Sequence, residues 1–193
     1  MISHFFLSAI LFFIVAVFYS LDFIFMLRFD RERKETGKGW SWDYTLLTIG
    51  LGLIVILQPV LFPKIGFQTP ALWGLGVQMV GLLMVVASLG LHVWSRQHLQ
   101  KFYVERIEVQ TDHQVIETGP YAWMRHPIIT SFFGLAFGIL LLAPAITTLF
   151  AFAYVLWDFV RDARQEESAL MEKLPGYADY MKRVPRFFPR LWK

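Results

Sequence analysis

Long apolar segments separated by polar loops dominate the chain. The first three cover residues 4–27, 44–62 and 70–94. Each is close to the ~20 residues that an α-helix needs to cross a bilayer. The first segment has no basic stretch before it and is too long for the apolar part of a signal peptide. We therefore expect it to be a membrane span rather than a cleaved leader.

The fourth apolar segment, residues 127–160, is too long for one span. As a single helix it would be about 51 Å long, against ~30 Å for the hydrocarbon core of a bilayer. Pro144 lies at its centre and cannot continue a helix. The sequence therefore predicts a tight helical hairpin with arms at residues 127–142 and 145–160. The second arm should continue as a polar helix to about Leu174, because Pro175-Gly176 then ends it.

These patterns predict an all-α, polytopic integral membrane protein with five transmembrane helices, the last two forming the tight hairpin. We expect one domain over residues 1–193, with three spans in residues 1–94. Residues 95–193 would hold a cofactor loop, the hairpin and a C-terminal helix. The third helix should continue past Trp94, and residues 103–109 alternate as a short extended segment that could pair with residues 114–116.

Small residues recur in the third apolar segment, where they favour close helix packing. They are Gly74, Gly76, Gly81, Ala87, Ser88 and Gly90. Two ionisable residues interrupt the apolar segments. Asp22 should face other helices or lie near the membrane interface, because a carboxylate facing lipid is costly. His92 is either hydrogen-bonded between helices or functional.

The composition supports a membrane protein. The 193 residues are 56% hydrophobic, with mean hydropathy +0.49, which is too apolar for an ordinary soluble domain. The chain has no cysteine. Disulfides, thiolate metal sites and a cysteine nucleophile are therefore excluded.

The distribution of basic residues predicts an orientation. With five spans, 17 of the 18 lysines and arginines fall on one side of the membrane, and only Lys64 falls on the other. By the positive-inside rule, the C-terminus and the polar loops then face the cytoplasm. We expect the active site on that face.

The polar segment from His113 to Pro127 carries the candidate chemistry. Gly119-Pro120 favours a turn, and Pro127 suits the first turn of a helix. Arg125 and His126 then precede a helix N-terminus, which favours anionic groups. A simpler interpretation is a turn at the membrane surface with an arginine anchoring the next span. The sequence has no Rossmann, P-loop or HExxH motif, and its five histidines have no metal-ligand spacing. We expect no metal and no nucleic-acid partner.

Several short motifs together resemble the isoprenylcysteine carboxyl methyltransferase family, which is related to the phospholipid N-methyltransferases. They are His113-Gln114-Val115-Ile116, Gly119-Pro120-Tyr121, Arg125-His126-Pro127, Glu166-Glu167-x-x-Leu170, Tyr177-x-x-Tyr180 and Arg183-Val184-Pro185, with an apolar hairpin before the glutamate pair. The resemblance covers about half the chain, from Leu89 onward. It implies methyl transfer from S-adenosylmethionine at the membrane–cytosol boundary.

The resemblance also implies roles for individual residues. The cofactor would be lined by His113, Gln114, Val115, Ile116, Tyr121, His126, Pro127, Ile128 and Ile129. The catalytic, acceptor-side group would be Glu166 with either Arg161 or Arg164. Chemistry adds Arg125, which could meet the carboxylate of the cofactor, and Glu167, a second carboxylate that could accept its ribose hydroxyls. Ile129 departs from the family, which usually has an aromatic residue there.

The acceptor and two other functions stay open at this point. We expect a lipophilic acceptor. A prenylated cysteine carboxylate, a lipid and an isoprenoid are candidates, and a small thiol is equally open. Membrane lipids would surround the protein. A membrane NADPH-dependent sterol-type reductase is an alternative, since such enzymes have a broadly similar helical core. A non-enzymatic membrane scaffold is another.

Overall fold

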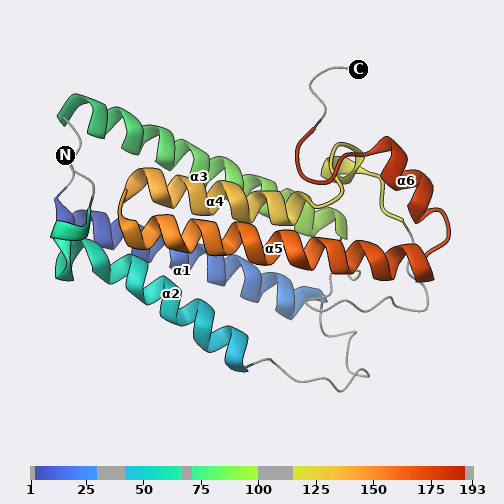
Figure 1. Cartoon of the computed structure of the whole chain (residues 1–193), viewed down its shortest axis with the longest axis horizontal. Helices are drawn as coiled ribbons and strands as arrows, with labels where there is room; N and C mark the ends of the chain where they lie inside the picture. The colour runs from blue at the N-terminus through green and yellow to red at the C-terminus, as the bar shows by residue number, and fades with distance from the viewer. Residues whose placement is uncertain (1–2, 30–41, 67–70, 100–114, 190–193) are drawn as a thin grey trace.

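Five long helices lie side by side along the long axis of the molecule (Figure 1). The computed structural model describes residues 3–29, 42–66, 71–99 and 115–189. The helices are α1 His4–Phe29, α2 Trp42–Leu61, α3 Ala71–Leu99, α4 Pro127–Leu142 and α5 Ile146–Lys173. Within the described ranges there is no strand, only an isolated bridge between Gly66 and Ala145. The predicted all-α class is confirmed, and the extended segment predicted at residues 103–109 lies outside the described residues.

Each long helix runs opposite to the one before it, as the colours of Figure 1 show. The last turns of α1 and α3 and the first turn of α4 therefore lie at the same end of the bundle, on the right of the figure. The helix α5 extends beyond them at that end. Residues far apart in the sequence, from the start of α4 and the last third of α5, are thereby brought together.

The reversal between α4 and α5 is fixed by Thr148. Its Oγ1 accepts a hydrogen bond from the Ala145 N–H at 3.0 Å and donates to the Ala143 carbonyl at 2.8 Å. These bonds satisfy backbone groups that helix ends leave without intrahelical partners. Pro144 lies between the two helices, where it interrupts no backbone hydrogen bond. The predicted hairpin is confirmed, with α5 beginning at Ile146 rather than at Ala145.

Glycines let α3 and α4 approach closely. A Cβ added to Gly81 would lie 2.7 Å from the Gly138 carbonyl oxygen, and one added to Gly134 would collide with Ser88 Oγ. Small residues are needed where helix backbones come this near. The predicted packing role is thus confirmed for Gly81 and Ser88. It is wrong for Gly76 and Gly90, where an added Cβ would have no neighbour within 4 Å.

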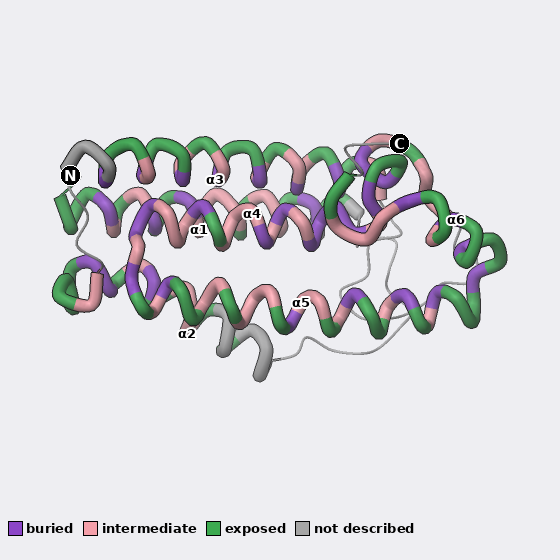
Figure 2. The backbone as a smooth tube through the Cα atoms, turned by 45° about the horizontal axis from the view of Figure 1, so that its top comes forward, coloured by how far each residue is buried: buried purple, intermediate pink, exposed green. Residues whose placement is uncertain are grey.

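The outer surface of the bundle is strongly apolar. Large side chains such as Phe5, Phe13 and Leu53 are more than half exposed, and exposed positions recur along α1, α2 and α3 (Figure 2). Two segments, His4–Phe25 and Gly74–Leu99, are long and apolar enough to cross a membrane. Two further apolar helices are shorter. The number of spans therefore stays a prediction.

The chain folds back on itself after α5. Gly176, at φ +85°, makes the turn into the short helix α6 Tyr177–Arg183, which the sequence did not predict. Here α6 packs through Tyr177 and Tyr180 on Leu170 and Leu174. A 3₁₀ turn, η4 Gly119–Ala122, lies under α6, and residues 185–187 then run beside the start of α4. We call residues 185–187 the C-terminal strap.

Candidate functional site

The carboxylate of Glu167 is the centre of a buried polar cluster. Its side chain is 3% exposed. Its Oε1 accepts hydrogen bonds from Arg125 Nε at 2.9 Å and from His126 Nε2 at 3.1 Å. Its Oε2 accepts from Arg186 Nη2 at 2.6 Å. Burial alone would raise the pKa of Glu167, but its bonds to His126, Arg186 and Arg125 lower it to about 2. Glu167 is therefore an anion throughout the physiological range.

His126 lies between the two glutamates of α5. Its Nε2 faces Glu167, and its Nδ1 lies 3.4 Å from Glu166 Oε2. Burial lowers the pKa of His126, but hydrogen bonds to Glu166 and Glu167 outweigh that effect and raise it above the ordinary value. A histidine with carboxylates at both nitrogens favours the imidazolium form, in which both nitrogens donate.

Arg125 is engaged by internal partners. Besides Glu167, its Nη1 donates to the Met181 and Val184 carbonyls at 2.9 and 2.7 Å, at the end of α6. The backbone N–H groups of Arg125 and His126 donate to the Pro185 and Arg186 carbonyls. The Arg125 guanidinium and the backbone N–H groups of Arg125 and His126 thus all have partners within the protein. A cofactor-binding role for Arg125 stays a prediction.

The two glutamates of α5 differ in exposure. The side chain of Glu166 is 46% exposed, whereas that of Glu167 is enclosed. Successive residues of a helix point about 100° apart, which follows from 3.6 residues per turn. Glu167 therefore faces the protein interior and α4, while Glu166 presents a carboxylate oxygen to the surroundings next to His126.

Neither candidate arginine joins this cluster within the described ranges. Arg161 pairs with Asp158 at 2.7 Å and with Asp162 at 3.1 Å, and its guanidinium stacks on Trp157. Arg164 is exposed, and no salt bridge joins it to another side chain in the part of the chain that the structure describes. The choice between Arg161 and Arg164 for the acceptor side stays a prediction.

The other predicted cofactor residues that the structure describes lie in three segments. Tyr121 is buried in η4, and its carbonyl accepts a hydrogen bond from Tyr180 Oη at 2.7 Å. Pro127, Ile128 and Ile129 form the buried first turn of α4. Val115 and Ile116 are half-buried beside α6. His113 and Gln114 lie outside the described residues.

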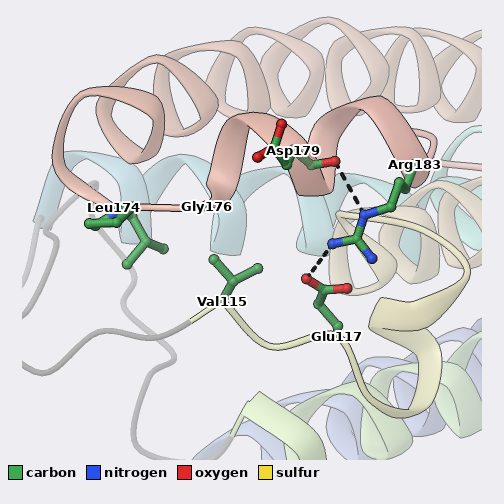
Figure 3. Close-up of a pocket in the computed structure, with 7 residues that line it drawn as sticks. Val115, Glu117, Leu174, Gly176, Asp179 and Arg183 are labelled. Atoms are coloured by element: carbon green, nitrogen blue, oxygen red, sulfur yellow. Dashed lines mark hydrogen bonds and ion pairs between the residues drawn. The ribbon is translucent and has the colours of Figure 1, made fainter.

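A shallow open depression lies beside α6 (Figure 3). Its volume is about 590 Å³. It is lined by Val115, Glu117, Leu174, Pro175, Gly176, Asp179 and Arg183. Arg183 Nη2 donates to Glu117 Oε1 at 2.8 Å across it. Only Val115 belongs to the predicted cofactor residues, so this depression borders the site rather than containing it.

The sequence missed Arg186 and Phe187 of the strap. Arg186 holds Glu167, and the Phe187 ring packs against His126 and Phe133, with centroids 5.9 and 5.1 Å apart. The available signal was the neighbouring Arg183-Val184-Pro185 motif, which marks the segment without identifying its contacts. Those contacts form only because α6, which follows α5 in the chain, turns residues 185–187 back towards the start of α4.

A second polar cluster lies deeper in the bundle. Asp22 of α1 pairs with Arg96 of α3 at 3.2 Å, and His92 lies 3.6 Å from the same carboxylate oxygen. His92 Nδ1 also lies 3.3 Å from Ser131 Oγ of α4. The interhelical alternative is confirmed for both Asp22 and His92. This cluster connects three helices near the start of α4.

Comparisons with known proteins show what this chain is similar to. The model of the isoprenylcysteine carboxyl methyltransferase family matches residues 79–172. The chain is 28% identical over 136 residues to a protein-S-isoprenylcysteine O-methyltransferase of Saccharomyces cerevisiae, covering 67% of this chain and 56% of that protein. It is 28% identical over 155 residues to the Homo sapiens protein of the same name, covering 77% and 52%. The chain thus spans about half the length of these curated relatives.

A solved structure has the same fold. It is that of the eukaryotic intramembrane Ras methyltransferase of this family, with a TM-score of 0.67, 20% identity, and coverage of 91% of this chain and 63% of that one. The likeness shows that the two proteins share a fold. The region matched by the family model contains most of α3, the Arg-His-Pro start of α4 and the glutamate pair of α5. Over this segment, 94 of the 193 residues, the chain is similar to the isoprenylcysteine carboxyl methyltransferase family.

Proposed function

We propose that this protein is an integral membrane methyltransferase that uses S-adenosylmethionine and methylates a lipophilic acceptor at the membrane–cytosol interface. The first candidate acceptor is the carboxylate of a prenylated cysteine, the substrate in the names of its relatives. One observation carries the proposal. The Arg125-His126-Pro127 start of α4 lies directly against the Glu166-Glu167 pair of α5, although about forty residues separate them.

We further propose that all five long helices span the membrane, with the site facing the cytoplasm. The strongly basic loops and tail support this orientation by the positive-inside rule. The helices α4 and α5 have short apolar arms, which a bilayer accommodates by local thinning or through flanking polar residues. The candidate site then lies at the level where the apolar part of α5 gives way to its charged part, after Val160.

The residues at this site fit the proposed cofactor. Glu166 is the partly exposed carboxylate, so it can accept hydrogen bonds from a ribose diol, whereas Glu167 is enclosed by protein donors. Tyr121, Ile128 and Ile129 supply apolar surroundings suited to an adenine ring. His113 and Gln114 are proposed from the resemblance alone. We assign Glu167 to holding His126 in place and not to direct contact with the ribose.

The chemistry requires alignment more than proton transfer. S-adenosylmethionine supplies an activated methyl group on its sulfonium when bound. Holding donor and acceptor in line can contribute about 7–11 kcal/mol to lowering the barrier. A carboxylate acceptor is already ionised at neutral pH, so the protein needs no general base. Arg164 has an exposed guanidinium that could meet such a carboxylate in a two-point contact, and we propose it rather than Arg161 for that role.

A transfer assay tests the function. Detergent-purified protein would be given methyl-labelled S-adenosylmethionine and an S-farnesyl cysteine with a free carboxylate. The matched control is the same compound with its carboxylate converted to an amide. We expect label in the free acid only. If neither compound is labelled while the cofactor still binds, a prenylated cysteine carboxylate is not the acceptor. Label in both would contradict carboxylate methylation.

A further inference from the structure

The C-terminal strap is bonded to the start of α4 along its whole length. The Arg125 N–H donates to the Pro185 carbonyl at 2.9 Å, and the His126 N–H donates to the Arg186 carbonyl at 3.0 Å. Thr130 Oγ1 donates to the Phe187 carbonyl at 2.7 Å. These bonds fix the strap backbone beside the Arg-His-Pro segment, so that its side chains have defined positions.

One of those side chains, Arg186, donates hydrogen bonds to the buried carboxylate of Glu167. Its Nε lies 3.1 Å from both carboxylate oxygens, and its Nη2 lies 2.6 Å from Oε2. Arg125 approaches the same carboxylate through Oε1, at 2.9 Å from Nε and 2.8 Å from Nη2. Two planar guanidinium groups therefore fix both oxygens of Glu167.

A fixed Glu167 in turn fixes His126. The imidazole donates to Glu167 through Nε2, which directs Nδ1 towards Glu166. Contacts thus run without interruption from Arg186 through Glu167 and His126 to Glu166, the partly exposed carboxylate. Arg186 itself is three contacts away from Glu166, so any effect it has there passes through Glu167 and His126.

We propose that Arg186 is a positioning residue of the methyl-donor site and acts through Glu167. The C-terminal strap is accordingly a wall of the site and not a free tail. This inference rests on the proposed function, because it concerns the same site. Arg186 touches neither reacting group, so its loss weakens cofactor binding by releasing Glu167 and the imidazole that Glu167 orients.

A structural role in the strap is the competing explanation. Phe187 packs on Phe133 and Ile129. In this explanation, a substitution at Arg186 weakens cofactor binding because it loosens that apolar contact, and Glu167 plays no part. The two explanations differ in how Arg186 and Glu167 combine. A residue that acts through Glu167 has no further effect once Glu167 is neutral, whereas an independent role adds its effect in either background.

A double-mutant cycle on cofactor affinity makes the test. S-adenosylmethionine would be titrated by calorimetry into full-length, detergent-purified wild type, Arg186→Gln, Glu167→Gln and the double variant. We expect Arg186→Gln to weaken binding about tenfold in the wild-type background, a loss of ~1.4 kcal/mol. In the Glu167→Gln background the same change should alter affinity less than twofold. Arg186→Lys, which keeps the charge but loses the fork, should fall between Arg186→Gln and wild type.

Matched controls separate the possible failures. Lys182→Gln removes an exposed cation of α6 that pairs with Asp179 on its own helix, and this variant should bind as wild type does. Equal weakening by Arg186→Gln in both backgrounds, or wild-type affinity in Arg186→Gln, would overturn the assignment while leaving the proposed function intact. If Arg186→Gln does not fold, Arg186→Lys decides by the same cycle. If the wild-type protein binds no S-adenosylmethionine, both the proposed function and the role assigned to Arg186 are wrong.

Discussion

His126 Nε2 and Glu167 Oε1 lie 3.1 Å apart, although 41 residues separate them in the sequence. The contact joins the first turn of α4 to the polar end of α5 across a complete helical hairpin. It depends on the reversal at residues 143–145, which returns α5 to the end of the bundle where α4 began. The local signals for the hairpin therefore also determine which polar residues meet.

The pH dependence of stability should reveal this contact. The pKa of His126 is raised in the folded protein, so its imidazolium contributes stability that is fully present below the unfolded pKa, about 6.5. That contribution is lost as the pH rises through the folded pKa. We expect the melting temperature of wild type to fall as pH rises above about 6.5. In His126→Gln this part of the slope should disappear. Parallel curves for the two proteins would contradict the assignment.

Removing the charge of Glu167 should destabilise the fold strongly. Glu167→Gln leaves Arg125, Arg186 and His126 without their common anion in a buried site. Breaking a buried ion pair from one side costs about 3–5 kcal/mol. The measurement is thermal or denaturant unfolding in detergent at pH 7. Glu172→Gln is the control, because that residue is exposed on the same helix and should change stability by less than about 0.5 kcal/mol. Equal stability of the two variants would show that the cluster is not energetically important.

Acid should act on wild type through the same residue. Glu167 has a pKa of about 2, which is lowered from its ordinary value, so its contribution is complete above about pH 4.5. As the pH falls from about 4.5 towards 2, that contribution is progressively lost. The groups that face this carboxylate are Arg125, His126 and Arg186, which all stay cationic there. The stability difference between wild type and Glu167→Gln should therefore narrow over this interval. A difference independent of pH would contradict the explanation.

Close packing of α3 on α4 gives a prediction that is independent of function. Gly81→Ala places a methyl 2.7 Å from the Gly138 carbonyl, so the two helices must separate. We expect a loss of about 1–3 kcal/mol, measured by thermal unfolding. Gly76→Ala, in the same helix with no neighbour within 4 Å, should be neutral or slightly stabilising because alanine favours the helix. If Gly76→Ala lost more stability than Gly81→Ala, the close contact between α3 and α4 at Gly81 would be contradicted.

Glu166 should separate binding and turnover from stability. Glu166→Gln keeps the shape of the side chain but removes charge-assisted hydrogen bonds, each worth roughly 1.5–3 kcal/mol. With a working acceptor and saturating cofactor, turnover should fall by about one to two orders of magnitude. The fold should be nearly unaffected, because this side chain is 46% exposed. If Glu166→Gln turns over at the wild-type rate, Glu166 has no role in the reaction and is only part of a solvated helix face.

The boundaries of the long helices could be predicted because they depend on local signals in the sequence. Apolar segments of suitable length, Pro144 in the centre of the fourth and Pro175-Gly176 after the fifth specify where helices begin and end. The helix α6 could not be predicted in this way. It has only seven residues, and it is held by tertiary contacts such as the hydrogen bond from Tyr180 to the Tyr121 carbonyl.

The candidate site could be predicted in part for a similar reason. The Arg125-His126-Pro127 and Glu166-Glu167 motifs marked the two segments that meet. The sequence could not show that Glu167 is enclosed and Glu166 half-exposed, since that difference follows from the rotation of α5 against α4. It also could not show that Arg186 completes the cluster, because this contact requires α6 to turn the chain back over the site.

The most direct measurement is a calorimetric titration of S-adenosylmethionine into the detergent-purified protein, with NADPH titrated in parallel. The central claim is that the meeting of α4 and α5 forms a methyl-donor site. We predict saturable binding of S-adenosylmethionine and none of NADPH. His126→Ala and Tyr121→Ala should weaken binding at least tenfold while Lys182→Gln leaves it unchanged. Failure of wild type to bind S-adenosylmethionine, or equal affinity in all four proteins, would contradict the claim.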